Sequence, residues 1–297
     1  MPNTLEKHFI IGVPTFNRSR FISRIVNSVQ NQNYSNWTIL FVDDYSVDDT
    51  KNTILNFTEK TTKIQYRKMS KNSGVNAVRN CIIEQAKLID NDAYLLLIDD
   101  DDYLAPNSLR AANKEVSAHP NLNWFCLNCN YQNGHTISKI TQYGTLSYLN
   151  DYMFGKKIRG DLTHILKLTA IEGQVFTSEF KNGEEWYFWA NLSVNYDLYA
   201  INAPGSIKEY LEGGLTATGI NRDKAIQVLK FKIDTLEPIV GKKKMVHQYV
   251  SLAKHYLAQE EHKNASGLLK HAFKVSPFYL RQYRHWIVLF IKTCLKT

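Results

Sequence analysis

Four consecutive aspartates, Asp99 to Asp102, follow an apolar run in the first half of this chain. The preceding residues, 95–98, are all Leu or Ile, which is typical of a buried strand in a parallel sheet. In open α/β sheets ligands bind beyond the carboxyl ends of the strands. Adjacent like charges raise one another's pKa unless a cation neutralises them, and Mg²⁺ or Mn²⁺ prefers such oxygen ligands. The run therefore predicts a metal-assisted phosphate site, with a solvated acidic turn as the alternative.

The first half of the chain alternates strand-like and helix-like segments, which indicates a parallel sheet covered by helices. Apolar residues recur at helical spacing in residues 19–30. The first strand is expected to end at Pro14 and the second at Asp43 and Asp44. Because the carboxyl ends of parallel strands share one edge, these carboxylates are predicted to converge on one cleft with residues 99–102. Strands are expected at 9–13, 38–42, 64–67 and 95–98, and helices at 19–30, around 54–57, at 75–86 and at 108–118.

The second half shows a weaker pattern. A strand is expected at 124–129, followed by a polar region without clear elements. A helix is expected to open at Gly183, with Glu184 and Glu185 in its first turn, where carboxylates suit the positive end of the helix dipole. Residues 221–297 are expected to be wholly helical.

Charge is concentrated at the C-terminal end. Residues 221–297 contain 15 Lys and Arg against 5 Asp and Glu, although the whole chain has a net charge of +8. Such asymmetry favours contact with an anionic surface. Residues 279–292 mix basic, aromatic and apolar side chains over a length too short to cross a bilayer, so they are expected to lie in its interface.

The cysteines and the first residues point to a reducing compartment. Four cysteines are too few and too scattered for a disulfide framework. Cys126 and Cys129 form a single C-x-x-C inside an apolar stretch, and we interpret them as buried structural thiols. Residues 1–8 lack the pattern of a signal peptide. We therefore expect a cytoplasmic location, at the inner face of the membrane if the C-terminal segment binds it.

Five motifs occur in an order that resembles a known family: residues 13–18 (Val-Pro-Thr-Phe-Asn-Arg), 42–50, 72–80, 98–102 and 183–186. Together they resemble a family 2 glycosyltransferase of the GT-A fold, a group of bacterial enzymes that build lipopolysaccharide, capsule and related glycans. The resemblance covers about residues 8–218. It implies a Rossmann-like α/β catalytic domain over residues 1–220, followed by a basic helical region over 221–297.

The resemblance also implies a reaction and a site. A sugar would pass with inversion from a nucleoside diphosphate donor, with UDP the expected nucleotide, to a glycan or lipid-linked acceptor. Asp101, supported by Asp99 or Asp100, would hold Mn²⁺ or Mg²⁺, and Asp44 would accept the N3–H of the base. Glu185 falls at the position of the general base, where the family usually has Asp. The resemblance assigns nucleotide-sugar binding to Pro14, Thr15, Asn17, Asp43, Asp44, Asn72, Arg79, Asp99 and Asp100, and the acceptor side to Glu184, Trp186, Gly213 and Gly214.

Two other functions remain open. A nucleotidyltransferase would also combine an α/β nucleotide domain with aspartate-bound metal, but it usually carries a glycine-rich phosphate loop, and residues 14–18 contain no glycine. A non-catalytic scaffold could dock through the helical tail. A nicotinamide enzyme is disfavoured because no G-x-G-x-x-G follows the first strand, and nucleic acid because no recognised module is present. The oligomeric state stays open.

Overall fold

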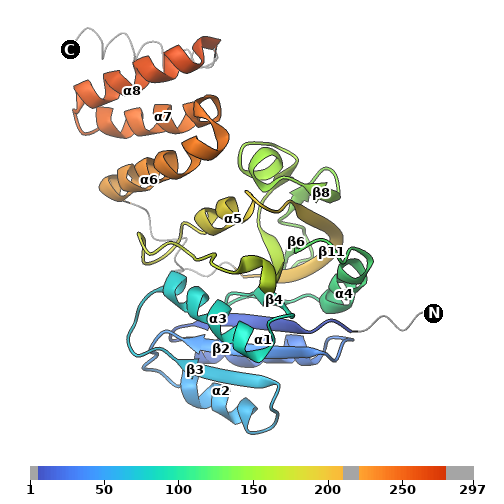
Figure 1. Cartoon of the computed structure of the whole chain (residues 1–297). Coiled ribbons are helices and arrows are strands. Elements are labelled where there is room, and N and C mark those ends of the chain that lie inside the picture. Colours follow the sequence, from blue (N-terminus) through green and yellow to red (C-terminus); the bar gives the residue numbers. More distant parts are fainter. Residues whose placement is uncertain (1–5, 210–220, 279–297) are drawn as a thin grey trace. The chain divides into compact units, whose positions relative to one another are not determined.

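A computed structural model describes residues 6–209 and 221–278 of the chain (Figure 1). The chain divides into two compact units, residues 1–215 and 216–297. The candidate site residues Gly213 and Gly214, and the segment 279–292 that is expected to bind a membrane interface, lie outside the described residues.

A mixed sheet forms the centre of the first unit. β3, β2, β1 and β4 are parallel, and β10 runs antiparallel to both of its neighbours, β4 and β6. The carboxyl ends of β1, β2 and β4 therefore lie along one edge. The strand order is β3 (Ile64–Lys68), β2 (Trp37–Asp43), β1 (Phe9–Thr15), β4 (Tyr94–Leu97), β10 (Leu162–Lys167), β6 (Trp124–Tyr131), β11 (Leu198–Lys208) and β5 (Tyr103–Leu104), with β8 (Gly144–Leu146) paired to β11.

Helices cover both faces of the sheet (Figure 1). On one face, Phe9, Ile11 and Val13 of β1 share a buried core with apolar residues of α1 (Ser19–Gln30), α2 (Thr50–Thr58) and α4 (Ser108–Ala118). On the other face lies α3 (Val75–Ile89). A Cβ added at Gly12 would lie 2.3 Å from Cγ2 of Ile82 on α3. Gly12 therefore allows α3 to pack directly on the strand.

The first strand extends beyond its predicted end. β1 continues through Pro14, which pairs with Val42, to Thr15. Gly12 accepts a hydrogen bond from Ile98 N on the β4 side, and the pairing with β4 stops there. The backbone nitrogen of Pro14 faces the β4 side, beyond the last residue of β1 that pairs with β4. The N–H that proline lacks would therefore have formed no hydrogen bond of the sheet. The sequence prediction was wrong because it treated proline as a strand terminator.

The helix that carries the predicted base is shorter than expected. α5 spans Trp186–Leu192, with Glu185 at its N-cap. Gly183 and Glu184 both have positive φ, at 83° and 58°. Left-handed backbone cannot continue a helix, so the prediction that both glutamates lie in the first turn was wrong.

Smaller elements complete this unit. β7 (Lys139–Ile140) pairs with β9 (Ile158–Arg159), a π-helical turn spans Tyr148–Met153, and a 3₁₀ turn spans Leu168–Ile171. Cys126 and Cys129 are fully buried on β6, and burial raises the pKa of both thiols.

The second unit contains α6 (Arg222–Val240), α7 (Lys242–Leu257) and α8 (His262–Val275). Leu236, Tyr249 and Leu269, one from each helix, are buried. The Tyr249 hydroxyl also donates to Glu237 at 2.6 Å. Within the described ranges, none of the helices combines the length and the apolar character needed to span a bilayer.

Candidate active site

The end of β2 is fixed by Asp43, which is fully buried. Its Oδ1 accepts from the Ser46 backbone N–H at 2.8 Å, and its Oδ2 accepts from the Tyr66 hydroxyl at 2.7 Å. Asn17, with a φ of 55°, joins the same loop, because its Oδ1 accepts from Val47 N at 2.9 Å. Asp43 and Asn17 thus shape the loops that follow β2 and β1.

The neighbouring Asp44 connects β2 to α3. Its two carboxylate oxygens accept the backbone N–H groups of Ser73 and Gly74 at 2.6 and 2.8 Å, and Asn72 donates to its carbonyl at 3.2 Å. The Asp44 backbone N–H in turn donates to Thr15 O at 2.8 Å. The strand ends that carry Pro14 and Thr15 are therefore joined to the turn that begins α3. A carboxylate has about four lone-pair sites, so Asp44 retains acceptor capacity for a further donor.

Three of the four aspartates in the run face a cationic side chain. Asp99 pairs with Arg79 at 2.8 Å, Asp100 with Arg18 at 3.4 Å, and Asp102 with Lys208 at 2.8 Å. Among the residues that the structure describes, the Asp101 carboxylate has no ion-pair partner. Asp101 is thus the carboxylate of the run that forms no ion pair within the described part of the chain.

Burial and mutual repulsion change the acidity of these groups. Burial raises the pKa of Asp100 to about 7, with the nearby Arg18 charge opposing the change. Burial and then the charge of Asp99 raise the pKa of Asp101. For Asp99, desolvation is outweighed by Arg79 and Lys208, which lower its pKa. Burial is thus the main cause of the raised pKa at Asp100 and Asp101, and the neighbouring carboxylates add to it.

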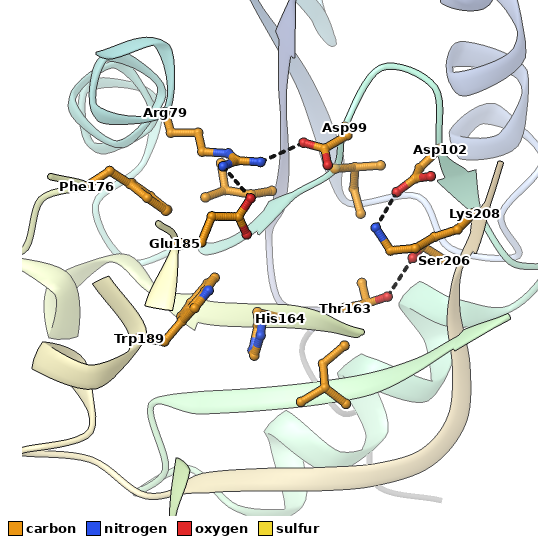
Figure 2. Close-up of a pocket in the computed structure, with 13 residues that line it drawn as sticks. Arg79, Asp99, Asp102, Thr163, His164, Phe176, Glu185, Trp189, Ser206 and Lys208 are labelled. Carbon is orange, nitrogen blue, oxygen red and sulfur yellow. Dashed lines mark hydrogen bonds and ion pairs between the residues drawn. The ribbon is translucent and has the colours of Figure 1, made fainter. Parts of the chain in front are cut away.

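Arg79 joins the aspartate run to the predicted base (Figure 2). Its Nη2 donates to Asp99 at 2.8 Å and its Nη1 donates to Glu185 Oε1 at 2.7 Å. The Arg79 side chain is only 7% exposed, whereas those of Asp99 and Glu185 are 44% and 46% exposed. A buried guanidinium therefore orients two accessible carboxylates.

Two asparagines of α3 hold the segment that precedes Glu185. The Asn76 amide donates to the carbonyls of Thr177, Phe180 and Gly183 at 3.0 to 3.1 Å. Asn80 and the Phe176 backbone exchange two hydrogen bonds of 3.0 and 2.7 Å. The base position is therefore set from the same helix that carries Arg79.

A cavity of about 60 Å³ lies between Asp99 and Glu185 (Figure 2). It is lined by Arg79, Leu97, Ile98, Asp99, Asp102, Leu162, Thr163, His164, Phe176, Glu185, Trp189, Ser206 and Lys208. Polar groups from the aspartate run that follows β4, from β10 and from β11 meet here beside the aromatic rings of Phe176 and Trp189. The cavity adjoins both the aspartate run and the predicted base.

The sequence motifs did not identify His164, Thr163, Ser206 or Lys208 as site residues. All four come from β10 and β11, for which no strand was predicted. Glu184 lies outside the cavity lining and accepts a hydrogen bond from the Trp186 indole. Among the described residues no cluster of three or more His, Cys, Asp or Glu is arranged to hold a metal ion.

The protein has an α/β fold, and its acidic site lies at the edge of the sheet where such folds bind nucleotides. The sequence model described as "Glycosyl transferase family 2" matches residues 10–169. The chain therefore belongs to glycosyltransferase family 2, as the motifs predicted.

Two bacterial relatives are named as beta-1,3-glucosyltransferases that act on undecaprenol-diphosphate-linked acceptors. A Campylobacter jejuni GalNAc(5)-diNAcBac-PP-undecaprenol beta-1,3-glucosyltransferase is 27% identical over 63% of this chain and 60% of its own length. The Escherichia coli UDP-Glc:alpha-D-GlcNAc-diphosphoundecaprenol beta-1,3-glucosyltransferase WfgD is 26% identical over 77% of this chain and 85% of its own.

Solved structures show the same fold. Residues 1–349 of Staphylococcus aureus TarS, in complex with UDP-GlcNAc, give a TM-score of 0.68 at 16% identity, covering 90% of this chain and 81% of that one. The mannosyltransferase PcManGT from Pyrobaculum calidifontis, with GDP-Man and Mn²⁺, gives 0.55 at 14% identity, covering 98% and 85%. These similarities confirm the predicted GT-A architecture.

Proposed function

We propose that this protein transfers a hexosyl group from a UDP-sugar, with inversion, to a hydroxyl of a lipid-linked glycan. Family membership supports glycosyl transfer. The two bacterial relatives, both named for undecaprenol-diphosphate-linked acceptors and one for UDP-Glc, support the donor and acceptor classes. The observation that carries the proposal is the bridge from Asp99 through Arg79 to Glu185, which fixes the donor side relative to a carboxylate that could act as base.

Glu185 is proposed as the general base. One of its oxygens is held by Arg79, and the other has no hydrogen-bond partner among the described residues. The second oxygen can therefore accept the proton of an acceptor hydroxyl as that hydroxyl attacks the anomeric carbon. The backbone before α5 adopts left-handed conformations, so the Glu185 carboxylate is not placed as it would be in the first turn of a regular helix. The Glu185 side chain is also one methylene longer than the Asp that the family usually has at this position.

Asp101 and Asp99 fit a divalent cation. Carboxylate oxygens suit Mg²⁺ and Mn²⁺, and Asp101 has no ion-pair partner among the described residues. A bound ion would supply Lewis-acid stabilisation of the leaving diphosphate. Asp100 and Asp102 are less suited, because their side chains are only 11% and 6% exposed, whereas that of Asp99 is 44% exposed.

Nucleotide recognition is proposed for the loops after β1 and β2. Pro14, Thr15 and Asn17 lie at the end of β1, and Asp44 retains lone pairs for the imide N–H of uracil. The hydrogen bonds from Ser73 and Gly74 would hold the Asp44 carboxylate in place for that contact.

Calorimetric titration with UDP, dTDP and GDP, each with and without Mn²⁺, tests this proposal. We expect UDP to bind and its binding to strengthen with Mn²⁺. In a separate assay, the protein should release UDP from a UDP-sugar only when an acceptor is present. Diphosphate release from a nucleoside triphosphate would instead indicate a nucleotidyltransferase. Failure to bind any of the nucleotides, alone or with acceptor, would favour a non-catalytic scaffold.

A further inference from the structure

The imidazole of His164 forms part of the wall of the cavity between Asp99 and Glu185 (Figure 2). Its ring stacks on Trp189 with 3.9 Å between the centroids. Trp124, itself almost fully buried, donates from Nε1 to His164 Nδ1 at 3.0 Å. Protein thus covers one ring face and the Nδ1 edge, yet the residue keeps partial exposure.

The contact with Trp124 fixes the tautomer of His164. An indole N–H can only donate, so Nδ1 must accept, and a neutral imidazole then carries its proton on Nε2. This Nε2–H has no hydrogen-bond acceptor among the described residues. Burial and the nearby Lys208 charge lower the pKa of His164 to about 3, which keeps the ring neutral at physiological pH. His164 therefore offers one uncharged donor of fixed direction.

The other polar groups of the cavity are mostly engaged. Lys208 donates to Asp102, and the Thr163 hydroxyl donates to Ser206 at 2.8 Å. Asp99 keeps an accessible carboxylate in the same cavity. A sugar hydroxyl both accepts and donates, so it can pair with His164 on one side and with a carboxylate on the other. A volume of about 60 Å³ holds several waters, each of which needs roughly 10–15 Å³, and therefore one edge of a sugar ring.

We propose that His164 is a specificity-determining residue that donates a hydrogen bond from Nε2 to one hydroxyl oxygen of the transferred sugar. This inference rests on the proposed function, because it requires a sugar between Asp99 and Glu185. The Trp124 contact makes the recognition directional: a hydroxyl oxygen at this position is bound, and a deoxy carbon leaves a donor unpaired.

Two substitutions of His164 separate the roles of its two ring nitrogens. The amide of Asn ends near the position of Nδ1, so His164→Asn keeps an acceptor for Trp124 and removes the cavity donor. The longer side chain of Gln reaches the position of Nε2, so His164→Gln restores the donor and removes the acceptor. Thermal unfolding of both variants shows whether the fold is kept.

The test measures kcat/KM of the wild type and both variants with the accepted UDP-sugar and with its series of monodeoxy analogues. We expect one analogue to lose roughly 3- to 10-fold with the wild type, the range of one neutral hydrogen bond. His164→Asn should show the same loss with the parent sugar and no further loss with that analogue, whereas His164→Gln should still discriminate.

Equal penalties for that analogue in the wild type and His164→Asn would overturn the assignment, as would unchanged activity of His164→Asn. If no variant folds, the wild-type series alone decides, because tolerance of every single deoxygenation excludes a hydroxyl contact. Absence of transfer by the wild type with every UDP-sugar and acceptor would refute the proposed function itself, which distinguishes the two failures.

Discussion

Replacing Arg79 by Lys tests whether the bridge between Asp99 and Glu185 sets the reactive geometry. Lys keeps the positive charge but loses the planar fork that donates to two carboxylates at once. Both hydrogen bonds, of 2.7 and 2.8 Å, are charge-assisted. They leave from two different guanidinium nitrogens, and the single nitrogen of an ammonium cannot occupy both positions.

The expected loss of kcat/KM depends on how exposed the Asp99 and Glu185 carboxylates are. A hydrogen bond to a charged group contributes about 1.5–3 kcal/mol. Because the two carboxylates are 44% and 46% exposed, water compensates part of the loss, and the lower end applies. A loss of about 1.5 kcal/mol corresponds to roughly a tenfold decrease in kcat/KM.

The assay is steady-state UDP release in the presence of acceptor, with UDP affinity measured in parallel. Arg67→Lys is the matched control, because Arg67 makes an exposed hydrogen bond of 3.1 Å to Gln85 outside the site. Arg67→Lys should keep the wild-type kcat/KM. An Arg79→Lys protein that folds normally and stays within about twofold of the wild type would refute the reasoning.

Three further outcomes are expected. Glu185→Gln should retain UDP binding and lose transfer by at least about 100-fold, the lower range for a general base, as measured by calorimetry and product formation; equal loss of binding would contradict that role. Asp101→Asn should abolish the Mn²⁺-dependent increment of UDP binding, whereas a retained increment would move the metal site elsewhere. Because the folded-state pKa of His164 lies below its unfolded value, its contribution to stability is complete above about pH 6.5 and is lost as pH falls toward 3. The melting temperature of the wild type should thus fall more steeply than that of His164→Asn over this range; parallel curves would contradict a folded-state pKa of His164 below its unfolded value.

Periodicity predicted the elements whose sequence pattern is regular. The predicted helices at 19–30 and 108–118 match α1 and α4 at both ends. In both segments the apolar residues recur at helical spacing without a break, and tertiary contacts do not interrupt either helix. The strand before the aspartate run was equally clear, because four apolar residues precede four carboxylates.

Local patterns could not predict β11 or its role. Its pairing with β6 is shifted around Pro204, and Pro204-Gly205 breaks any alternating pattern. Lys208 at its end pairs with Asp102, more than 100 residues earlier in the chain, because β11 runs antiparallel to β5. No motif identified His164 for a similar reason, because its environment depends on a hydrogen bond from Trp124 of the neighbouring strand β6.

The stereochemistry of the product tests the central claim most directly. Wild-type protein, an α-linked UDP-hexose and an undecaprenyl-diphosphate-linked acceptor are incubated with Mn²⁺, and the new anomeric proton is followed by NMR. The account predicts a β-linked product that forms with the wild type and is lost with Glu185→Gln. An α-linked product, or a β-linked product formed at an undiminished rate by Glu185→Gln, would contradict direct displacement assisted by Glu185.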